Sequence, residues 1–280
     1  MIGSFLESWA LFQYTYLAGW LIGLLLSLVG VLVVARDQIF LGVAVAQAST
    51  LGIAIGLGSG SLLGALWLQS DGFLSLIAVV FAVLAALFTV RRGVAGSESH
   101  EASTGWVFLL SASLSILLVA HSPHGLDEVH RLLSSSIIGA TAADVWTFAG
   151  LASVTTVAVG MTRRRVLLFA LDPTMATAVG MHVSRWAAGT AVWLGLAVGL
   201  SMRVSGMLYT FGSLVLPALV AKNLCREVST VFVVAPGIAI GTSALGFVLA
   251  NYYDYPPGQM TVALLSVWLM VAWGIRRARP

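Results

Sequence analysis

The chain has 280 residues, of which 59% are hydrophobic and 9% are charged. Soluble globular domains carry roughly 25% charged residues, so this composition excludes an ordinary soluble domain and predicts a chain that lies in a lipid bilayer. The formal net charge is +3, but the positive residues lie almost entirely at the ends of hydrophobic segments. Membrane topology explains that placement, and we expect no nucleic-acid partner. The single cysteine, Cys225, excludes an internal disulfide.

Hydrophobic segments of about 20 residues recur along the chain, the length that crosses a hydrocarbon core of about 30 Å. We predict an all-α polytopic membrane protein with eight or nine transmembrane helices, in a single transmembrane permease domain over residues 1–280. The N-terminal residues carry no lysine or arginine, so we expect no cleavable signal peptide. The predicted spans cover residues 17–35, 39–57, 62–90, 105–120, 145–161, 186–202, 206–220, 231–252 and 260–275.

Two segments differ from an ordinary lipid-facing span. Residues 39–57 are rich in Ala, Gly and Ser, and small residues let helix backbones approach closely, so we expect an interior helix. Residues 132–143 contain three consecutive serines and are too short and polar to cross the membrane. We therefore treat residues 132–143 as a candidate re-entrant segment.

The arginines and lysines predict the orientation of the spans. Alternating the spans leaves only Arg131 and Arg203 on one side, whereas the other side receives most of the basic residues, including those at the C-terminus. By the positive-inside rule the basic side is cytoplasmic. The C-terminus is then cytoplasmic, and the loop 121–131 faces outside.

A short helix is predicted on the cytoplasmic side, directly after the arginines at 163–165. Asp172 suits the N-cap and Pro173 the first helical position, and Gly180 suits a left-handed stop. So short a helix covers roughly 10 Å and cannot cross the bilayer. It is either a docking element for a soluble partner or a surface helix that links two spans.

The predicted outer loop, HSPHGLDEVHR, contains side chains that bind transition metals. His121, His124, Asp127 and His130 lie within ten residues, and imidazole and carboxylate are ligands that zinc, manganese and iron accept. These residues are candidate outer-face metal ligands. The alternative is a polar outer loop that happens to contain histidine.

Gln47 is a polar side chain within the small-residue span. Polar residues at membrane depth tend to face a bundle interior or a transport path, and an interhelical hydrogen bond is the alternative. The sequence contains no Walker A lysine loop, no GxSxG and no HExxH motif. We therefore expect no enzyme activity and no cofactor in this chain.

Four stretches in order resemble the permease subunit of the ABC-3 family of zinc, manganese and iron ABC importers. They are VARDQIFLGVAVAQASTLGIAIG, SPHGLDEVHRLLSSSIIGAT, LDPTMATAVGMHVSRW, and SGMLYTFGSLVLPALVAKNL followed by YYDYPPGQ. The third resembles the family's cytoplasmic coupling segment, D-P-E-x-A-x-x-x-G. The resemblance implies that Asp172, Ala176 and Gly180 couple the permease to its ATPase, with Thr174 in place of the family's glutamate.

The second span departs from the family pattern. Many members have G-D-x-x-x-H there, and the acidic residue and the histidine are associated with the metal or its path. In this sequence Gly42 is present, but Val43 replaces the acidic residue and Gln47 replaces the histidine. An amide oxygen is a weaker and harder donor than imidazole. Either the metal passes with little coordination, or the cargo differs.

The resemblance also implies the assembly and the location. It implies a permease homodimer in the bacterial cytoplasmic membrane, in contact with lipid, working by alternating access. A cytoplasmic ATP-binding subunit would bind and hydrolyse ATP, and an extracytoplasmic metal-binding protein would deliver the ion. One alternative is a permease for metal chelates of the siderophore or corrinoid type. The other is a secondary transporter driven by an ion gradient, although the spans show no acidic relay and no internal repeat.

Overall fold

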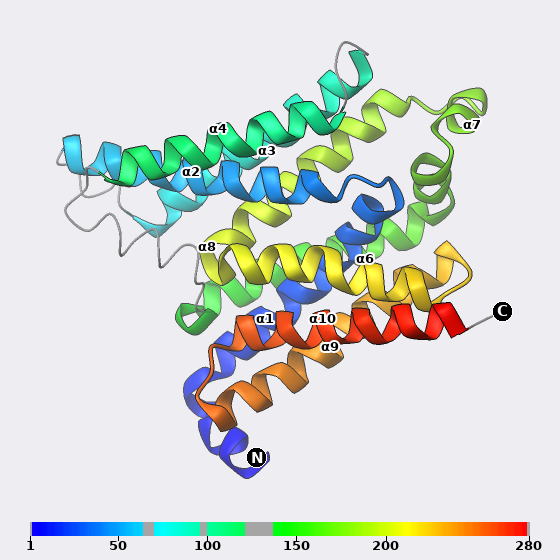
Figure 1. Cartoon of the computed structure of the whole chain (residues 1–280). Coiled ribbons are helices and arrows are strands. Elements are labelled where there is room, and N and C mark those ends of the chain that lie inside the picture. The colour runs from blue at the N-terminus through cyan, green and yellow to red at the C-terminus, as the bar shows by residue number, and fades with distance from the viewer. Residues whose placement is uncertain (1, 64–69, 96–99, 121–136, 279–280) are drawn as a thin grey trace. The chain divides into compact units, whose positions relative to one another are not determined.

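The computed structural model describes residues 2–63, 70–95, 100–120 and 137–278, and all regular secondary structure in these residues is helical. The elements, drawn in Figure 1, are α1 (Ile2–Ala35), α2 (Ile39–Leu63), α3 (Asp71–Ala95), α4 (His100–Ala120), η2 (Ile137–Gly139), α6 (Ala142–Leu171), α7 (Pro173–Ala178), α8 (Val183–Leu224), α9 (Val228–Tyr253) and α10 (Pro257–Ala278).

Eight helices in the described residues are long and apolar enough to cross a membrane, which confirms the predicted all-α polytopic architecture. α8 has 42 residues, or about 63 Å at 1.5 Å per residue, which is twice the thickness of a hydrocarbon core. Its backbone leaves the helical conformation at Gly206, with φ 68° and ψ 179°, a region essentially restricted to glycine. α8 is therefore two helices, residues 183–205 and 207–224, which match two predicted spans.

Some helices extend past the predicted spans. α6 continues to Leu171, whereas the predicted span ended at Met161. Hydropathy marks only the part of a helix that suits hydrocarbon, and MTRRRVLLFAL contains no glycine or proline to stop the helix. Of the candidate re-entrant segment, residues 132–136 lie outside the described residues. The remainder forms η2 and the start of α6, where Thr141 and Asp144 form a capping box.

The chain divides into two compact units. Unit 1 comprises residues 1–37, 135–173 and 208–280, and contains α1, α6, the second half of α8, α9 and α10. Unit 2 comprises residues 38–134 and 174–207, and contains α2, α3, α4, nearly all of α7 and the first half of α8. That residues 1–280 act as a single domain stays a prediction.

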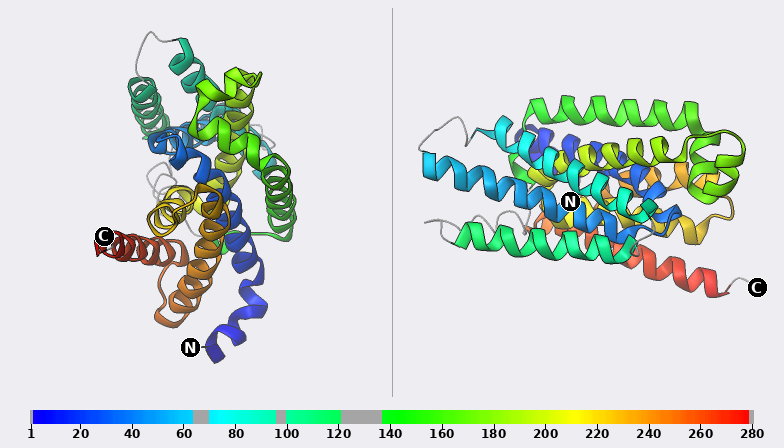
Figure 2. Two further views of the ribbon diagram at one scale, coloured as in Figure 1. Left: turned by 90° about the vertical axis from the view of Figure 1, so that its right-hand side faces the viewer. Right: turned by 90° about the horizontal axis from the view of Figure 1, so that it is seen from above.

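A buried tyrosine joins three helices of unit 1. α1 packs against α6 and α9, and α9 packs against α10, as Figures 1 and 2 show. The phenol of Tyr209, on α8, donates to the backbone oxygen of Gly19 on α1 at 2.8 Å, and lies 3.1 Å from Ser243 Oγ on α9. Its ring stacks on Phe247 with centroids 6.4 Å apart. This buried hydroxyl is satisfied, as a polar group in an apolar core requires.

The backbones of unit 1 approach most closely at glycine. A Cβ added to Gly30 on α1 would lie 1.7 Å from the carbonyl oxygen of Leu214 on α8, and one added to Gly246 on α9 would lie 2.5 Å from Thr261 Oγ1 on α10. Apolar side chains gain nothing by leaving lipid for another helix, so membrane helices associate through such close packing. Glycine at these positions is therefore a packing requirement.

Unit 2 is organised around the small-residue helix α2. Ala44 and Ala48 pack against Ala85 of α3 and Val107 of α4, and Figure 2 shows these three helices side by side. A Cβ on Gly52 would lie 2.8 Å from the carbonyl oxygen of Ile77 on α3. In the most apolar window of α2, 78% of the residues are buried, against 17% for α6. This confirms the prediction of an interior helix.

Polar contacts link neighbouring helices at one end of unit 1. Lys222, at the end of α8, lies 3.4 Å from Asp37, after α1. Arg163 of α6 donates to the carbonyl oxygen of Ser229 in the first turn of α9, 3.0 Å away. The guanidinium of Arg36 lies 4.5 Å from the centre of the Phe169 ring. These basic residues share one end of unit 1, as the alternation of spans predicted.

We expect Gly30→Ala to lower the melting temperature of the purified protein, because the added methyl group collides with backbone and overpacking costs about 1–3 kcal/mol or more. Gly150→Ala on α6 is the control, since no atom lies within 4 Å of its added Cβ and alanine favours the helix by about 1 kcal/mol. Thermal unfolding in detergent measures both variants. An unchanged melting temperature for Gly30→Ala would contradict the packing account.

Candidate functional site

The short helix α7 joins α6 to α8. α6 ends where the backbone N–H of Asp172 donates to Leu168 O at 3.0 Å, and Asp172 adopts φ −143° and ψ 86°, outside the helical region. Pro173 then begins α7, the position predicted for it, where its missing N–H costs no hydrogen bond. The sequence Asp-Pro thus ends one helix and begins the next.

Gly180 ends α7 in the left-handed conformation, with φ 82°. The N–H of Gly180 donates to Thr177 O and the N–H of Met181 donates to Ala176 O, both at 2.9 Å. This pair of bonds is the Schellman motif. The predicted left-handed stop is confirmed, and an L side chain at this position would cost about 1–2 kcal/mol.

The surface of α7 carries apolar residues that the coupling pattern does not name. Ala176 is fully buried and is the only residue from Leu171 to Gly180 that is. Met175 and Val179, one turn apart, are instead 54% and 66% exposed. The surface of α7 therefore carries an exposed apolar pair. Residues at i and i+4 share one face of a helix, so the sequence could have predicted this apolar pair, but the sequence analysis did not identify it.

Gln47 is buried in α2. Its side chain is 7% exposed, and its Oε1 has no hydrogen-bond partner among the described residues. A buried acceptor without a partner costs roughly 1–3 kcal/mol, so a cation or a donor that reached this oxygen would lower the free energy. Val43, one turn earlier, is half-buried and offers no polar atom.

Other polar groups in unit 2 are buried in the same way, and sequence reasoning did not identify them. The hydroxyl oxygens of Ser49, Ser103 and Ser201 are buried without a hydrogen-bond partner among the described residues. Small hydroxyl residues in membrane helices commonly bond to their own backbone, so the sequence alone did not separate these three from the others. Together with Gln47, these serines give unit 2 four buried polar side chains that can form a new hydrogen bond.

The candidate outer ligands His121, His124, Asp127 and His130 lie outside the described residues. The two histidines that are described, His100 and His182, do not extend this set. Within the part of the chain that the structure describes, no three His, Cys, Asp or Glu side chains are grouped to hold a metal ion. The predicted metal ligands of the outer loop stay a prediction.

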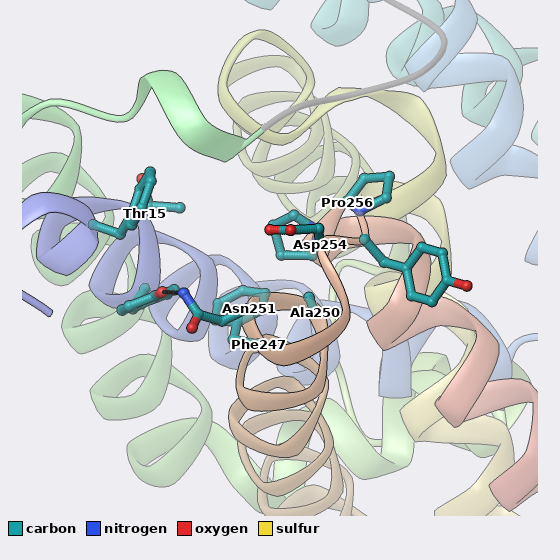
Figure 3. Close-up of a pocket in the computed structure, with 10 residues that line it drawn as sticks. Thr15, Phe247, Ala250, Asn251, Asp254 and Pro256 are labelled. Atoms are coloured by element: carbon teal, nitrogen blue, oxygen red, sulfur yellow. Dashed lines mark hydrogen bonds between the residues drawn. The ribbon is translucent and has the colours of Figure 1, made fainter. Parts of the chain in front are cut away.

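A cavity of about 310 Å³ opens in unit 1, at the end of α9 opposite to the basic residues (Figure 3). Asn251, which lines it, donates to Ser8 Oγ at 2.8 Å and to the hydroxyl of Tyr16 at 3.2 Å. The amide therefore joins α9 to α1. Asp254 follows α9 in the left-handed conformation, with φ 54°. The cavity contains none of the residues predicted for metal transport, so we assign its polar groups to the packing of α1 and α9.

Known proteins match this chain over most of its length. The manganese import system permease protein ScaB of Streptococcus gordonii is 23% identical over 257 residues, covering 91% of this chain and 87% of that protein. PsaBC from Streptococcus pneumoniae, solved in complex with a Fab, has a TM-score of 0.80 at 19% identity, covering 98% of this chain and 95% of that chain. An inward-facing, candidate metal-chelate type ABC transporter has a TM-score of 0.72 at 15% identity, over 93% and 85% of the two chains.

At these identities the solved structures show that the fold is shared. The family comparison goes further, because residues 8–275, from α1 to α10, match the ABC 3 transport family. The four sequence stretches that carry the resemblance all fall within this range. The chain is a multi-pass membrane protein and belongs to the ABC 3 transport family.

Proposed function

We propose that the chain is the permease subunit of an ATP-binding-cassette importer for a divalent transition metal, namely zinc, manganese or iron. The observation that carries this proposal is the similarity to a manganese import permease along 91% of the chain. The eight candidate spans of the described residues and the short helix α7 support a transport subunit that another protein drives.

The proposed orientation places the basic end of unit 1 in the cytoplasm. Lys222, Arg163 and Arg276 all lie at this end, and basic residues are retained on the cytoplasmic side of membrane proteins. The C-terminus then lies in the cytoplasm, and the chain resides in the bacterial inner membrane. The loop that contains His121, His124, Asp127 and His130 faces outside, where a metal-binding protein delivers the ion.

The proposed coupling element is α7. A separate ATP-binding subunit binds and hydrolyses ATP, and a second copy of the permease completes the transporter. Met175 and Val179 form an apolar contact for this subunit, and the Schellman motif at Gly180 fixes where α7 ends. Asp172 and Pro173 fix where it begins. A force applied to so short a helix is passed on over a short distance, because one residue separates α7 from α6 and four residues separate it from α8.

The proposed path residue is Gln47. Its buried amide oxygen could serve as a metal ligand. Oxygen ligands suit manganese better than zinc, which accepts softer nitrogen and sulfur ligands. One weak donor also suits transport, since an ion that is held too tightly is released slowly. The chain thus contributes a path and its gating, and the energy comes from ATP on the partner.

We expect Gly180→Ala to reduce ATP-driven metal uptake by about five-fold or more at equal amounts of assembled transporter, because about 1–2 kcal/mol of left-handed strain loosens the end of α7. Gly180→Asn is the matched control, since asparagine tolerates this conformation. Uptake into vesicles that contain the ATP-binding subunit measures both. Equal uptake by Gly180→Ala and the wild type would remove α7 from the coupling proposal.

For Gln47→Leu we expect metal uptake to fall about ten-fold or more, the loss of a contact of about 1.5–3 kcal/mol with a charged ligand. The melting temperature should hold or rise, because a buried acceptor without a partner is removed. Both are measured on the same preparation. If the variant instead unfolds at lower temperature, Gln47 serves helix packing through a hydrogen bond. Gln47→His provides the comparison with imidazole.

The metal content of cells tests the proposed function as a whole. Cells that lack the permease are grown under zinc, manganese or iron limitation and compared by elemental analysis with complemented cells. We expect one metal to be depleted and to recover only when the permease and its ATP-binding subunit are both present. Unchanged content of all three metals would contradict the proposal and direct the test to metal chelates.

A further inference from the structure

A second cavity lies at the basic end of unit 1, between the end of α8 and the last two turns of α10, the C-terminal helix in Figure 1. It measures about 740 Å³ and is lined by Asn223, Met270, Trp273, Gly274, Arg276 and Arg277. No residue of the proposed transport path or of α7 lines this cavity. Its lining is apolar toward the middle of α10 and cationic toward the end of the helix.

Gly274 is exposed and borders open space in this cavity. Glycine in a helix interior costs about 1 kcal/mol relative to alanine, and close packing accounts for Gly30 and Gly246. It does not account for Gly274, because no atom lies within 4 Å of a Cβ added there. The missing side chain leaves space beside Trp273 and the two arginines.

A hydrogen bond orients Arg276, and neither Arg276 nor Arg277 has an ion-pair partner among the described residues. Arg276 donates to Asn223 Oδ1 at 3.0 Å, and Asn223 is itself fixed because its amide donates to Leu219 O at 2.8 Å. Among the described residues, no carboxylate lies within ion-pair distance of Arg276 or Arg277. Two guanidinium groups without a counter-ion at one cavity favour an anion, and the fork of donors on arginine matches phosphate.

The apolar half of the cavity points to a lipid rather than to a soluble anion. Met270, Trp273, Gly274 and Arg277 follow the i, i+3, i+4, i+7 spacing of one helix face, and Met270 and Trp273 are 60% and 51% exposed. These two residues lie inside the segment of α10 that can span the membrane. The face therefore presents an apolar surface to acyl chains directly below a cationic surface for a headgroup.

We propose that this cavity binds one anionic phospholipid of the cytoplasmic leaflet, with its phosphate at Arg276 and Arg277 and an acyl chain along Met270 and Trp273. Basic pockets between membrane helices suit such headgroups, and tryptophan favours the interface. The proposal uses the orientation given above, and it does not depend on which metal is carried. The lipid would fill the space between α8 and α10 and join these two helices of unit 1.

Native mass spectrometry of the detergent-purified transporter, titrated with phosphatidylglycerol or phosphatidylcholine, tests the proposal. We expect one phosphatidylglycerol to be retained in preference to phosphatidylcholine. Arg276→Gln with Arg277→Gln should weaken its binding about 30-fold, since each basic residue near an anionic headgroup contributes roughly five-fold. Arg164→Gln with Arg165→Gln removes two exposed charges outside the cavity and should leave the binding unchanged.

Gly274→Leu provides an independent test, because it keeps both arginines and fills the space. It should also weaken phosphatidylglycerol binding, whereas Gly274→Ala, a small and helix-favouring change, should retain most of it. Equal retention of the two lipids by all variants would overturn the proposal. So would full displacement of phosphatidylglycerol by millimolar inorganic phosphate, which would indicate a site for free phosphate. If the arginine variants lost the ATP-binding subunit but retained phosphatidylglycerol, the result would also overturn the proposal. This face would then be a contact for the ATP-binding subunit.

Discussion

The close approach of helix backbones at glycine is the constraint on which the rest of this structure depends. In lipid there is no hydrophobic reward for bringing two apolar helices together, so contact area and backbone proximity must hold them. Gly30 against Leu214 in unit 1, and Gly52 against Ile77 in unit 2, provide this proximity. A single methyl group at either position would meet a carbonyl oxygen. Each unit therefore rests on residues whose only contribution is to be small.

The places where helices stop are as specific as the places where they touch. Unpaired backbone groups are costly in hydrocarbon, so a break needs a local reason. At Asp172 and Pro173 one helix ends and another begins without an intervening loop, and Gly180 closes α7 through two hydrogen bonds. Gly206 divides α8 by adopting a conformation that other residues avoid. These breaks divide the chain into separate helices where hydropathy alone would allow longer ones.

Polar side chains divide into those that stabilise the fold and those that remain open to new contacts. Tyr209 and Asn251 form hydrogen bonds that join helices of unit 1. Gln47 is buried without a partner among the described residues, and the charges of Arg276 and Arg277 have no carboxylate beside them. The first group explains stability. The second group is where an ion or a lipid gains most, since the protein has already borne the cost of burying or concentrating these groups.

The sequence by itself determined the helical class, the places of the main apolar spans, the interior position of α2 and both ends of α7. These follow from hydropathy, from small-residue content and from the fixed backbone preferences of proline and glycine, which act locally. Only the tertiary structure decided that Ala176 is buried while Met175 and Val179 are exposed, that Gln47 Oε1 has no partner among the described residues, and that Gly274 lines a cavity. Exposure and pairing depend on neighbours distant in the chain, and no pattern within one segment records them.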